Sequence, residues 1–515
     1  MQQSASLEHA SPQATTPLWS LREDVRVEAA EDGETVELHG RWADLRIRRP
    51  GPALIETLRR MSLGPVSLDN IPADQGAQRS WRAVLLGLQH LVVRSLAFAG
   101  SGQPVLSVVP LSRAARFAPE PPPADRALKL SRFAVLRREG DMFLLESPLS
   151  LHRVLLHKAE AQWVVAALGR PADVATVEAG LPLAEGVVVE ILGYLIGTGM
   201  ALVARSADGG FDEDEDAALR TWSAHDMLFH TRSVMGRTDG DFGATFAHAG
   251  SIAPQPAVKS RPRGKVVALP RPELGTIAAR DAPFTEVLEG RRSRRTYGAP
   301  ALRLSTLGEF LFRTARVRST GMSGAGETSY QVTDRPYPTG GAAYDLELYL
   351  TVRDCEGLVD GIHYYDPHEH ALVLVNDDPA AAGEMAAGAM AAAPLSGPPP
   401  VLITLTSRFQ RLSWKYSGLA YSLVLKHTGA LLQTFYLVGA AMGLATCAVC
   451  SEDIAVCAGA LGLDWRTESP VGSFVLGPRP EQPQEGADQP RTAEVFRTSL
   501  SEKAVDRPQG APPVE

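Results

Sequence analysis

The sequence predicts an α+β protein of about three domains, and three observations support this fold class. The chain has 515 residues, and a domain takes roughly 100–200 residues. Short segments such as TVELHG at 35–40 alternate apolar and polar residues, which is typical of strands with one exposed face. Segments such as ALIETLRRM at 53–61 have helical spacing, so we expect antiparallel-to-mixed sheets flanked by helices.

Composition and charge exclude several classes of protein. Hydrophobic residues make up 44% of the chain and charged residues 21%, so each domain can bury a core. The formal net charge of −8 argues against a nucleic-acid partner and against an anionic membrane surface. Four cysteines do not make a disulfide framework, and the N-terminus lacks the pattern of a signal peptide, so we expect a cytoplasmic protein.

The N-terminal part of the chain predicts a small α+β unit. Residues 1–17 are small and polar, and we expect them to be disordered. In the unit that follows, 18–117, the alternating segments VRVEAA, TVELHG and DLRIRR predict a small antiparallel sheet. Residues 53–61 and 81–96 have helical spacing, and residues 104–109 predict a further strand.

A second unit, 126–205, follows the stiff linker PEPPPAD. The segment LSRFAVLRREGDMFLLESPLS predicts a hairpin with its turn at Glu139-Gly140-Asp141. Three helices are predicted after it, at 160–168, 173–179 and 186–198, before a closing strand at 200–203. This order is typical of a winged-helix-like unit, and its recurrence in 18–117 indicates an internal duplication.

The rest of the chain divides into three segments. Residues 219–283 predict a helical segment and an extended linker, 284–479 a third domain, and 480–515 a disordered tail. Residues 428–449 are long and apolar enough to raise the question of a membrane span. They include Gln433 and several threonines, so we predict a buried core helix there instead.

Two short motifs of the third domain suit a bound ligand. RRSRR at 291–295 places four guanidiniums and a hydroxyl in five residues, which suits a phosphate group. The same pattern also fits a solvated basic face. PTGG at 338–341 is a turn that lets backbone amides approach a ligand closely. A plain turn into the strand that follows fits this motif as well.

Lys415 and Tyr416 stand before a long apolar helix. A buried lysine can serve as a base, and an adjacent tyrosine can donate or accept a proton. A lysine lying along the surface is the alternative interpretation. The three histidines of GIHYYDPHEH match no ligand spacing, and Cys447, Cys450 and Cys457 lack a fourth ligand, so we expect no metal site.

In combination these motifs resemble the nitroreductase-like fold, through RRSRR, the PTGG turn before a strand, and GLAT at 443–446. KY before an apolar helix, followed by LLQTFYLVGAAMGLA, is similar to the SagB-type dehydrogenases. That group includes the cyanobactin oxidases and the McbC-like component of microcin synthetases. FLLESPLSLHRVLLH and WSAHDMLFHTRSVMGRTDGDFG resemble the N-terminal half of its long members, so the resemblance spans about residues 18–477.

The resemblance implies an FMN-dependent enzyme that oxidises thiazoline or oxazoline rings to thiazole or oxazole in a ribosomally synthesised peptide. The implied partners are the precursor peptide, a cyclodehydratase, and a second copy of the chain in a homodimer. The N-terminal units resemble leader-recognition elements, which add a peptide as a strand. The implied cofactor-binding residues are Arg291, Arg292, Ser293, Arg295, Pro338, Thr339, Gly340, Gly341, Ala445, Thr446, Gly477 and Arg479. Thr339 replaces the usual serine and keeps its hydroxyl.

Aromatisation requires the ring to lose a proton while hydride goes to the flavin. We therefore expect Lys415 or Tyr416 to take the proton and the other to orient the ring. One alternative is the same flavin fold acting on a nitroaromatic, a quinone or another modified peptide. A second is a non-catalytic scaffold subunit of a synthetase complex. The negative charge disfavours a winged-helix regulator that binds DNA.

Overall fold

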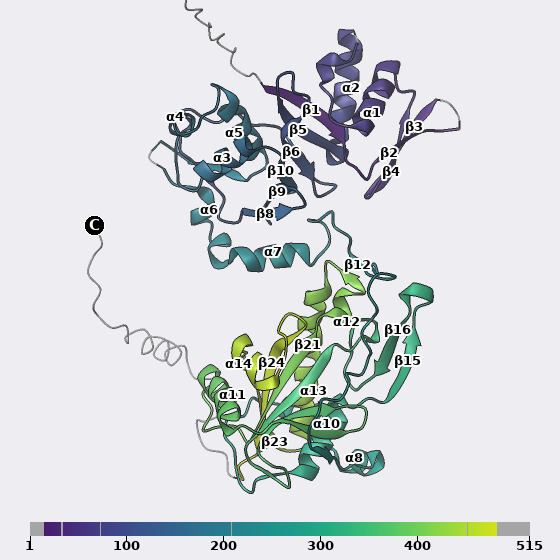
Figure 1. Cartoon of the computed structure of the whole chain (residues 1–515), viewed down its shortest axis with the longest axis vertical. Helices are drawn as coiled ribbons and strands as arrows, with labels where there is room; N and C mark the ends of the chain where they lie inside the picture. Colours follow the sequence, from purple (N-terminus) through teal and green to yellow (C-terminus); the bar gives the residue numbers. More distant parts are fainter. Residues whose placement is uncertain (1–14, 32–33, 73, 208, 451, 482–515) are drawn as a thin grey trace, which may run out of the picture. The chain divides into compact units, whose positions relative to one another are not determined.

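The computed structural model describes residues 15–31, 34–72, 74–207, 209–450 and 452–481 (Figure 1). It confirms the α+β fold class. The chain divides into two compact units, Met1–Phe242 and Gly243–Glu515. The predicted tails, 1–17 and 480–515, lie almost wholly outside the described residues. The first strand, β1 (Thr15–Leu21), begins earlier than predicted.

One six-stranded antiparallel sheet runs through the N-terminal unit, in the order β1-β5-β6-β10-β9-β8. Its other strands are β5 (Val92–Phe98), β6 (Pro104–Pro110), β8 (Val135–Glu139), β9 (Met142–Glu146) and β10 (His152–Leu156). β6 comes from the first predicted unit and β10 from the second, and they pair from His152↔Pro110 to Leu156↔Leu106. The two predicted units therefore share one sheet.

The first half of this unit carries a second, smaller sheet. β2 (Arg26–Ala29), β3 (Thr35–Gly40) and β4 (Ala43–Arg48) confirm the predicted alternating strands. The helices beside them are α1 (Pro52–Leu63) and α2 (Gln75–Gly87), with 3-10 turns at Leu68–Asn70 and Gln89–Leu91. The helix predicted at 81–96 is wrong in its second half, because the chain enters β5 at Val92. β-branched Val92 and Val93 favour a strand that pairs on both sides.

The second half of the unit confirms the predicted hairpin and three helices. β8 and β9 meet at Gly140, whose φ of 58° favours glycine. The helices are α3 (Ala159–Ala167), α4 (Val174–Ala179) and α5 (Val187–Gly197), and β11 (Ala201–Val203) pairs antiparallel with β7 (Leu128–Leu130). Ile191, Leu192 and Leu195 of α5 are fully buried, so this helix forms the centre of the local core.

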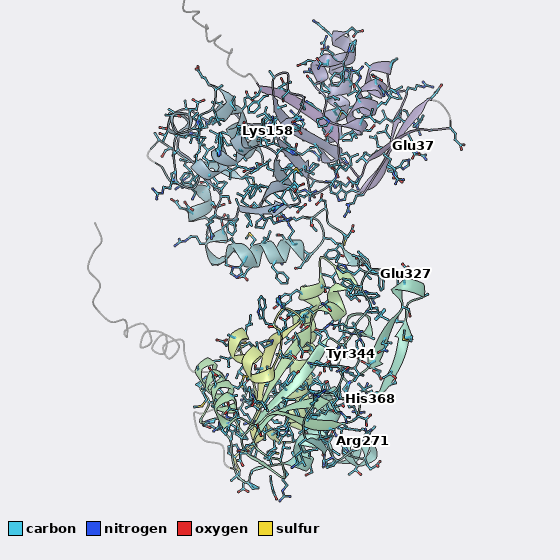
Figure 2. The ribbon with its side chains drawn as sticks, viewed as in Figure 1. Glu37, Lys158, Arg271, Glu327, Tyr344 and His368 are labelled. Carbon is cyan, nitrogen blue, oxygen red and sulfur yellow. The ribbon has the colours of Figure 1, made fainter. Side chains whose placement is uncertain are left out.

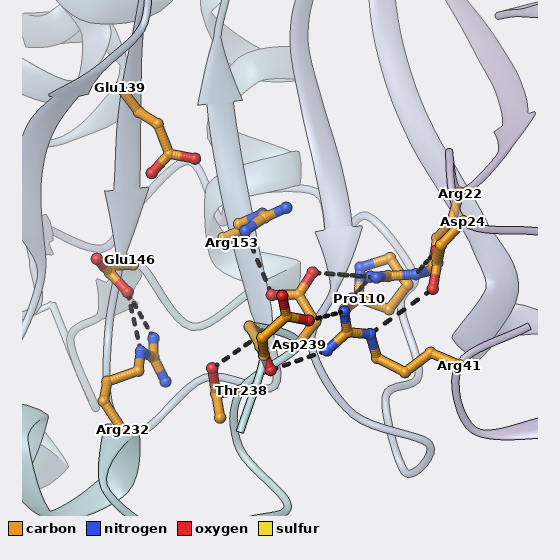
Figure 3. Close-up of polar contacts among 12 residues, drawn as sticks. Arg22, Asp24, Arg41, Pro110, Glu139, Glu146, Arg153, Arg232, Thr238 and Asp239 are labelled. Carbon is orange, nitrogen blue, oxygen red and sulfur yellow. Dashed lines mark hydrogen bonds and ion pairs between the residues drawn. The ribbon is translucent and has the colours of Figure 1, made fainter. Parts of the chain in front are cut away.

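The end of the N-terminal unit ties its two halves together (Figure 3). After α6 (Asp212–Glu215), a 3-10 turn (Leu219–Thr221) and α7 (Ala224–Arg232), the chain reaches Asp239. Asp239 accepts a hydrogen bond from Arg22 at 3.1 Å and one from Arg153 of β10 at 3.3 Å. Arg232 of α7 donates to Glu146 of β9 at 2.6 Å. The Arg22 and Asp239 side chains are only 7% and 6% exposed, so their charges depend on each other.

We expect Asp239→Ala to destabilise the N-terminal unit by about 3 kcal/mol, because it removes the buried carboxylate shared by Arg22 and Arg153 and leaves Arg22 only the partly exposed Asp24. The midpoint of this unit's thermal unfolding should fall by roughly 5–15 °C, measured by differential scanning calorimetry. Asp241→Ala is the matched control, since Asp241 is 68% exposed and pairs with Arg41 at the surface. Equal midpoints for the two variants would contradict a structural role for Asp239.

A seven-stranded antiparallel sheet forms the centre of the C-terminal unit, in the order β13-β20-β19-β17-β21-β24-β23. The strands are β13 (Val266–Ala268), β17 (Leu346–Val352), β19 (Gly361–Asp366), β20 (Ala371–Asn376), β21 (Val401–Arg408), β23 (Leu444–Val449) and β24 (Glu468–Pro478). α10 (Leu304–Ala315) and α13 (Ala420–Ala441) pack against one face, and α11 (Pro379–Ala392) and α14 (Ile454–Leu461) against the other. Adjacent Phe474 and Val475 of β24 enter these two opposite cores.

Short elements complete this unit. They are β12 (Gly243–Ala244), α8 (Leu274–Arg280), α9 (Phe284–Gly290), β14 (Leu302–Arg303), β15 (Ser319–Ser323), a 3-10 turn at Gly326–Thr328, β16 (Tyr330–Asp334), a 3-10 turn at Gly340–Ala342, β18 (Cys355–Glu356), α12 (Gln410–Ser413) and β22 (Tyr416–Ser417). β15 and β16 form an antiparallel hairpin, and β12 pairs with β22. The predicted extended linker thus contains α8 and joins the main sheet through β13.

α13 differs from the helix predicted at 428–449. It ends at Ala441, and β23 begins at Leu444, so the predicted segment is helix in its first part and strand in its last six residues. α13 buries one face, which includes Leu431 and Phe435, while Tyr421 and Leu425 are 48% and 43% exposed. No helix within the described ranges is long and apolar enough to cross a membrane.

Candidate active site

The PTGG turn lies directly against Lys415 and Tyr416. Gly341 adopts a φ of 59°, in the left-handed region that favours glycine. A Cβ atom at Gly341 would stand 2.2 Å from Lys415 Nζ and 2.7 Å from the Tyr416 hydroxyl. Only glycine therefore fits here without displacing the lysine. The structure brings together two motifs that are more than seventy residues apart, and we call Gly340, Gly341, Lys415, Tyr416 and Tyr330 the turn cluster.

Lys415 is a buried lysine in an aromatic environment. Its side chain is 9% exposed, and Nζ donates a hydrogen bond to the Tyr330 hydroxyl at 2.5 Å. Nζ lies 4.6 Å from the centre of the Tyr330 ring, 5.1 Å from that of Tyr416 and 5.6 Å from that of Phe246. Ring faces stabilise a cation at these distances. Because the side chain is buried, the surface-lysine interpretation is wrong. Among the described residues no carboxylate lies within ion-pair distance of Lys415.

The chain that precedes the main sheet fixes the backbone of Lys415 and Tyr416. The Phe246 amide donates to the Lys415 carbonyl at 3.1 Å, and Ala244 pairs with Tyr416 in the β12–β22 ladder. The Trp414 indole donates to the Ile252 carbonyl at 2.7 Å. Sequence reasoning placed this segment in a linker and missed its contact with the site. Such long-range pairing leaves no local pattern to detect.

A buried carboxylate and imidazole hold the glycine turn. The Gly340 amide donates to His427 Nε2 at 2.7 Å, so Nε2 is the acceptor nitrogen of a neutral ring. Nδ1 therefore carries the proton and donates it to Asp345 Oδ1 at 2.6 Å. Asp345 also accepts from Ser407 at 2.7 Å and is fully buried. The Gly340 amide is thus occupied within the protein, and the turn is fixed on α13.

The remaining residues of the turn are held differently. The Thr339 hydroxyl accepts from the Tyr344 amide at 3.3 Å, and the Tyr344 hydroxyl, labelled in Figure 2, donates to the Tyr337 carbonyl at 2.8 Å. Thr339 therefore stabilises the turn itself. Pro338 and Gly341 are exposed on the surface of this chain, where a ligand or a second subunit can reach them.

The basic motif forms a second group, the basic cluster, which consists of residues 291–295 with Tyr436. The Ser293 hydroxyl lies 2.8 Å from the Tyr436 hydroxyl, which also accepts from the Ala448 amide at 2.8 Å. The Arg291 guanidinium lies 5.0 Å from the centre of the Tyr436 ring. Burial raises the pKa of Tyr436, so this hydroxyl keeps its proton at neutral pH. Within the described residues the buried Arg295 Nε has no hydrogen-bond partner.

Three predicted residues lie on the strands beside the basic cluster, and a fourth, Arg479, directly follows β24. Ala445 pairs with Gly477 between β23 and β24, and both are buried. The Thr446 carbonyl accepts from the Arg294 amide at 2.8 Å, which attaches the basic motif to β23. A Cβ at Gly477 would stand 2.5 Å from a Tyr297 ring carbon, so this glycine makes room for packing. Arg479 is exposed.

The two clusters occupy different points of one helix. His427 contacts the turn cluster and Tyr436 contacts the basic cluster, nine residues further along α13. At 1.5 Å per residue the two points are roughly 14 Å apart. A single extended ligand, or two ligands at a subunit interface, would be needed to touch both.

The histidines and cysteines form no metal centre within the described ranges. The His370 ring bonds to the Tyr365 hydroxyl at 2.9 Å and the Pro270 carbonyl at 3.1 Å. Burial lowers the pKa of His370 to about 4, so it remains neutral. Cys447 and Cys457 are buried. These residues stabilise the fold of the C-terminal unit.

Comparison with known proteins finds two family matches on this chain. The cyanobactin oxidase ThcOx family model matches residues 128–239, and the nitroreductase family model matches residues 288–478. The chain combines a cyanobactin-oxidase region with a nitroreductase-family domain. In this nitroreductase-like oxidoreductase the turn cluster and the basic cluster both lie within the nitroreductase match. Asp239 is the last residue of the cyanobactin-oxidase match.

Relatives of this oxidoreductase include a protein of Methanocaldococcus jannaschii named as a nitroreductase. It is 29% identical over 190 residues, which cover 36% of this chain and 85% of the relative. A solved nitroreductase-like structure from Ralstonia eutropha is 20% identical to this chain, with a TM-score of 0.32. The match covers 45% of this chain and 98% of the Ralstonia chain. A chain of the E. coli microcin synthetase McbBCD complex is 19% identical, with a TM-score of 0.30. That match covers 51% of this chain and 86% of the synthetase chain.

Proposed function

We propose that this chain is an FMN-dependent dehydrogenase that oxidises thiazoline or oxazoline rings to thiazole or oxazole in a ribosomally synthesised peptide. One observation carries the proposal. The buried Lys415 and its neighbour Tyr416 lie against the glycine turn, in a chain that also contains a cyanobactin-oxidase region. A basic group and a phenol beside a flavin-type turn suit removal of a ring proton.

The residues present fit a flavin phosphate. Arg295 Nε is buried and has no hydrogen-bond partner in the part of the chain that the structure describes, Arg292 is exposed, and both are close in sequence to Ser293. We propose that Arg291, Arg292, Ser293 and Arg295 hold the phosphate and ribityl groups, with Gly477 and Arg479 nearby. Pro338, Thr339, Gly340 and Gly341 would line the flavin ring, with Ala445 and Thr446 beside it. Bound FMN supplies the two-electron redox capacity, as the hydride acceptor.

The chain itself supplies position and proton transfer. The azoline ring already contains its carbon–nitrogen double bond. It loses one hydrogen as a proton and one from the adjacent ring carbon as hydride, and the carbon–carbon double bond that forms between these two carbons completes the aromatic ring. We propose that Lys415 or Tyr416 takes the proton and the other group orients the ring. The aromatic rings around Lys415 Nζ exclude water, which strengthens the interaction of this group with a developing charge.

We propose that the leader of the precursor peptide binds at the outer edge of β8. β8 is the last strand of its sheet and pairs with β9, whereas the other edge, β1, is covered where Trp19 and Val66 exchange two hydrogen bonds of 2.9 Å. A free edge is what strand addition requires. Leader peptide should slow hydrogen–deuterium exchange at 135–139 and leave 15–21 unchanged. The reverse pattern would place the leader elsewhere.

We also propose a homodimer that uses the outer face of α13. Tyr421 and Leu425 are exposed on this helix, as are Phe284 and Leu288 on the neighbouring α9. Exposed apolar residues in such numbers on packed helices are typical of an interface. Sedimentation equilibrium should give twice the mass of the chain, and Leu425→Asp should give the monomer. A monomeric wild-type protein would refute this part of the proposal.

The function is tested with the purified full-length chain. Its visible spectrum should show bound oxidised flavin, and a synthetic peptide with one thiazoline should lose two hydrogens, followed by mass spectrometry, with oxygen as the acceptor. A flavin-bound protein that leaves the thiazoline unchanged but oxidises NADPH with a nitroaromatic would refute the azoline assignment. Such a result would make the chain a nitroreductase-like enzyme for another substrate. A protein that binds no added FMN would be a scaffold subunit.

A further inference from the structure

We infer that Tyr330 is a positioning residue that fixes the ε-amine of Lys415, an inference that rests on the proposed function. Tyr330 begins β16, in a hairpin that neither sequence motif includes. It is 4% exposed, and its hydroxyl lies between the two motifs. It accepts from Lys415 Nζ at 2.5 Å and donates to the Gly341 carbonyl at 2.8 Å. One phenol therefore joins the glycine turn to the lysine.

The direction of these bonds defines what Tyr330 does. A phenol has one proton, and Tyr330 gives it to the Gly341 carbonyl, which can only accept. The oxygen lone pairs are left for Lys415, so the lysine is the donor whether it is an ammonium or a neutral amine. In the neutral amine the nitrogen lone pair then points away from Tyr330. Tyr330 holds the nitrogen in place without competing for the electron pair that would accept the ring proton.

The rings around Tyr330 keep its hydroxyl in this position. Its ring centre lies 6.1 Å from that of Trp414 and 6.2 Å from that of Phe246. Phe246 and Trp414 also meet edge to face at 5.6 Å. These contacts belong to the ring and not to the hydroxyl. Tyr330→Phe should therefore keep the packing and remove only the two hydrogen bonds.

We expect Tyr330→Phe to lower kcat for the thiazoline peptide by about tenfold to a hundredfold, with little change in KM or in bound flavin. In a Lys415→Ala background the same substitution should cause no further loss, because its effect passes through Lys415. Tyr194→Phe is the matched control. Tyr194 is a buried tyrosine of the N-terminal unit whose hydroxyl donates to the Ser95 carbonyl at 3.1 Å.

A second measurement is independent of turnover. Brief treatment of the full-length protein with acetic anhydride, followed by peptide mass spectrometry, gives the acetylation rate of Lys415 relative to the exposed Lys426. Release of Nζ in Tyr330→Phe should raise this ratio by at least about threefold, the worth of one lost hydrogen bond, and Tyr194→Phe should leave it unchanged. An unchanged ratio in Tyr330→Phe, or an equal loss of kcat with and without Lys415, would overturn the inference. If the wild-type protein makes no thiazole while Tyr330→Phe still raises the ratio, only the proposed substrate is refuted.

Discussion

Lys415→Ala should lower the rate of azole formation by about a hundredfold to ten-thousandfold, which is the range for loss of a positioned acid–base group. The variant removes the only group in the turn cluster that can carry a full positive charge and also become a neutral base. The basic cluster lies roughly 14 Å away along α13, so flavin binding should survive. Single-turnover reduction of the bound flavin by a thiazoline peptide would measure the loss without interference from product release.

Three further variants separate the proton role of Lys415 from its packing. Lys415→Met keeps an unbranched side chain among the Phe246, Tyr330 and Tyr416 rings, and should lose as much activity as alanine. Lys426→Ala, at an exposed lysine of α13, should retain full activity. Tyr416→Phe should cause the smaller loss if Lys415 is the base, and the larger one if Tyr416 is. Full turnover in both Lys415→Ala and Tyr416→Phe would rule out the whole assignment.

Local patterns predicted the elements that depend on neighbouring residues. Alternation of side chains predicted β2, β3 and β4, and the β8–β9 hairpin followed from its glycine turn, because these signals need only a few adjacent residues. The boundary between α2 and β5 was mispredicted for the same reason. Leu88–Phe98 has apolar spacing that fits a helix, and only pairing with β1 and β6 makes its second half a strand.

Contacts between distant segments explain what the sequence could not predict about the site. Proline, hydroxyl and two glycines predicted the turn, and the lysine–tyrosine pair predicted proton chemistry, but no local signal joins either to Tyr330. The contact of His427 with Asp345 had a weak signal, since a histidine on the buried stripe of an apolar helix needs a polar partner. The partner is Asp345, which directly precedes β17 and is eighty-two positions away from His427 in the sequence. The shared sheet of the N-terminal unit is hidden in the same way.

Gly341→Ala should abolish most activity while costing the fold little. The new Cβ would stand 2.2 Å from Lys415 Nζ, 2.7 Å from the Tyr416 hydroxyl and 3.2 Å from the Tyr330 hydroxyl. All three are the far ends of side chains, so they can move aside at small cost to packing. Moving Nζ breaks its 2.5 Å bond to Tyr330, and a misplacement of about 1 Å can cost about a hundredfold in rate. We therefore expect kcat to fall by about a hundredfold.

Gly462→Ala isolates the backbone strain from the collision. Gly462 ends α14 with a φ of 66°, close to the 59° of Gly341, but no atom lies within 4 Å of its added Cβ. Both variants should lose about 1–2 kcal/mol of stability from the left-handed backbone and show similar unfolding midpoints. Only Gly341→Ala should lose turnover. Equal activity in the two variants would show that the position of Lys415 Nζ does not limit the reaction, and would leave the glycine turn with a purely structural role.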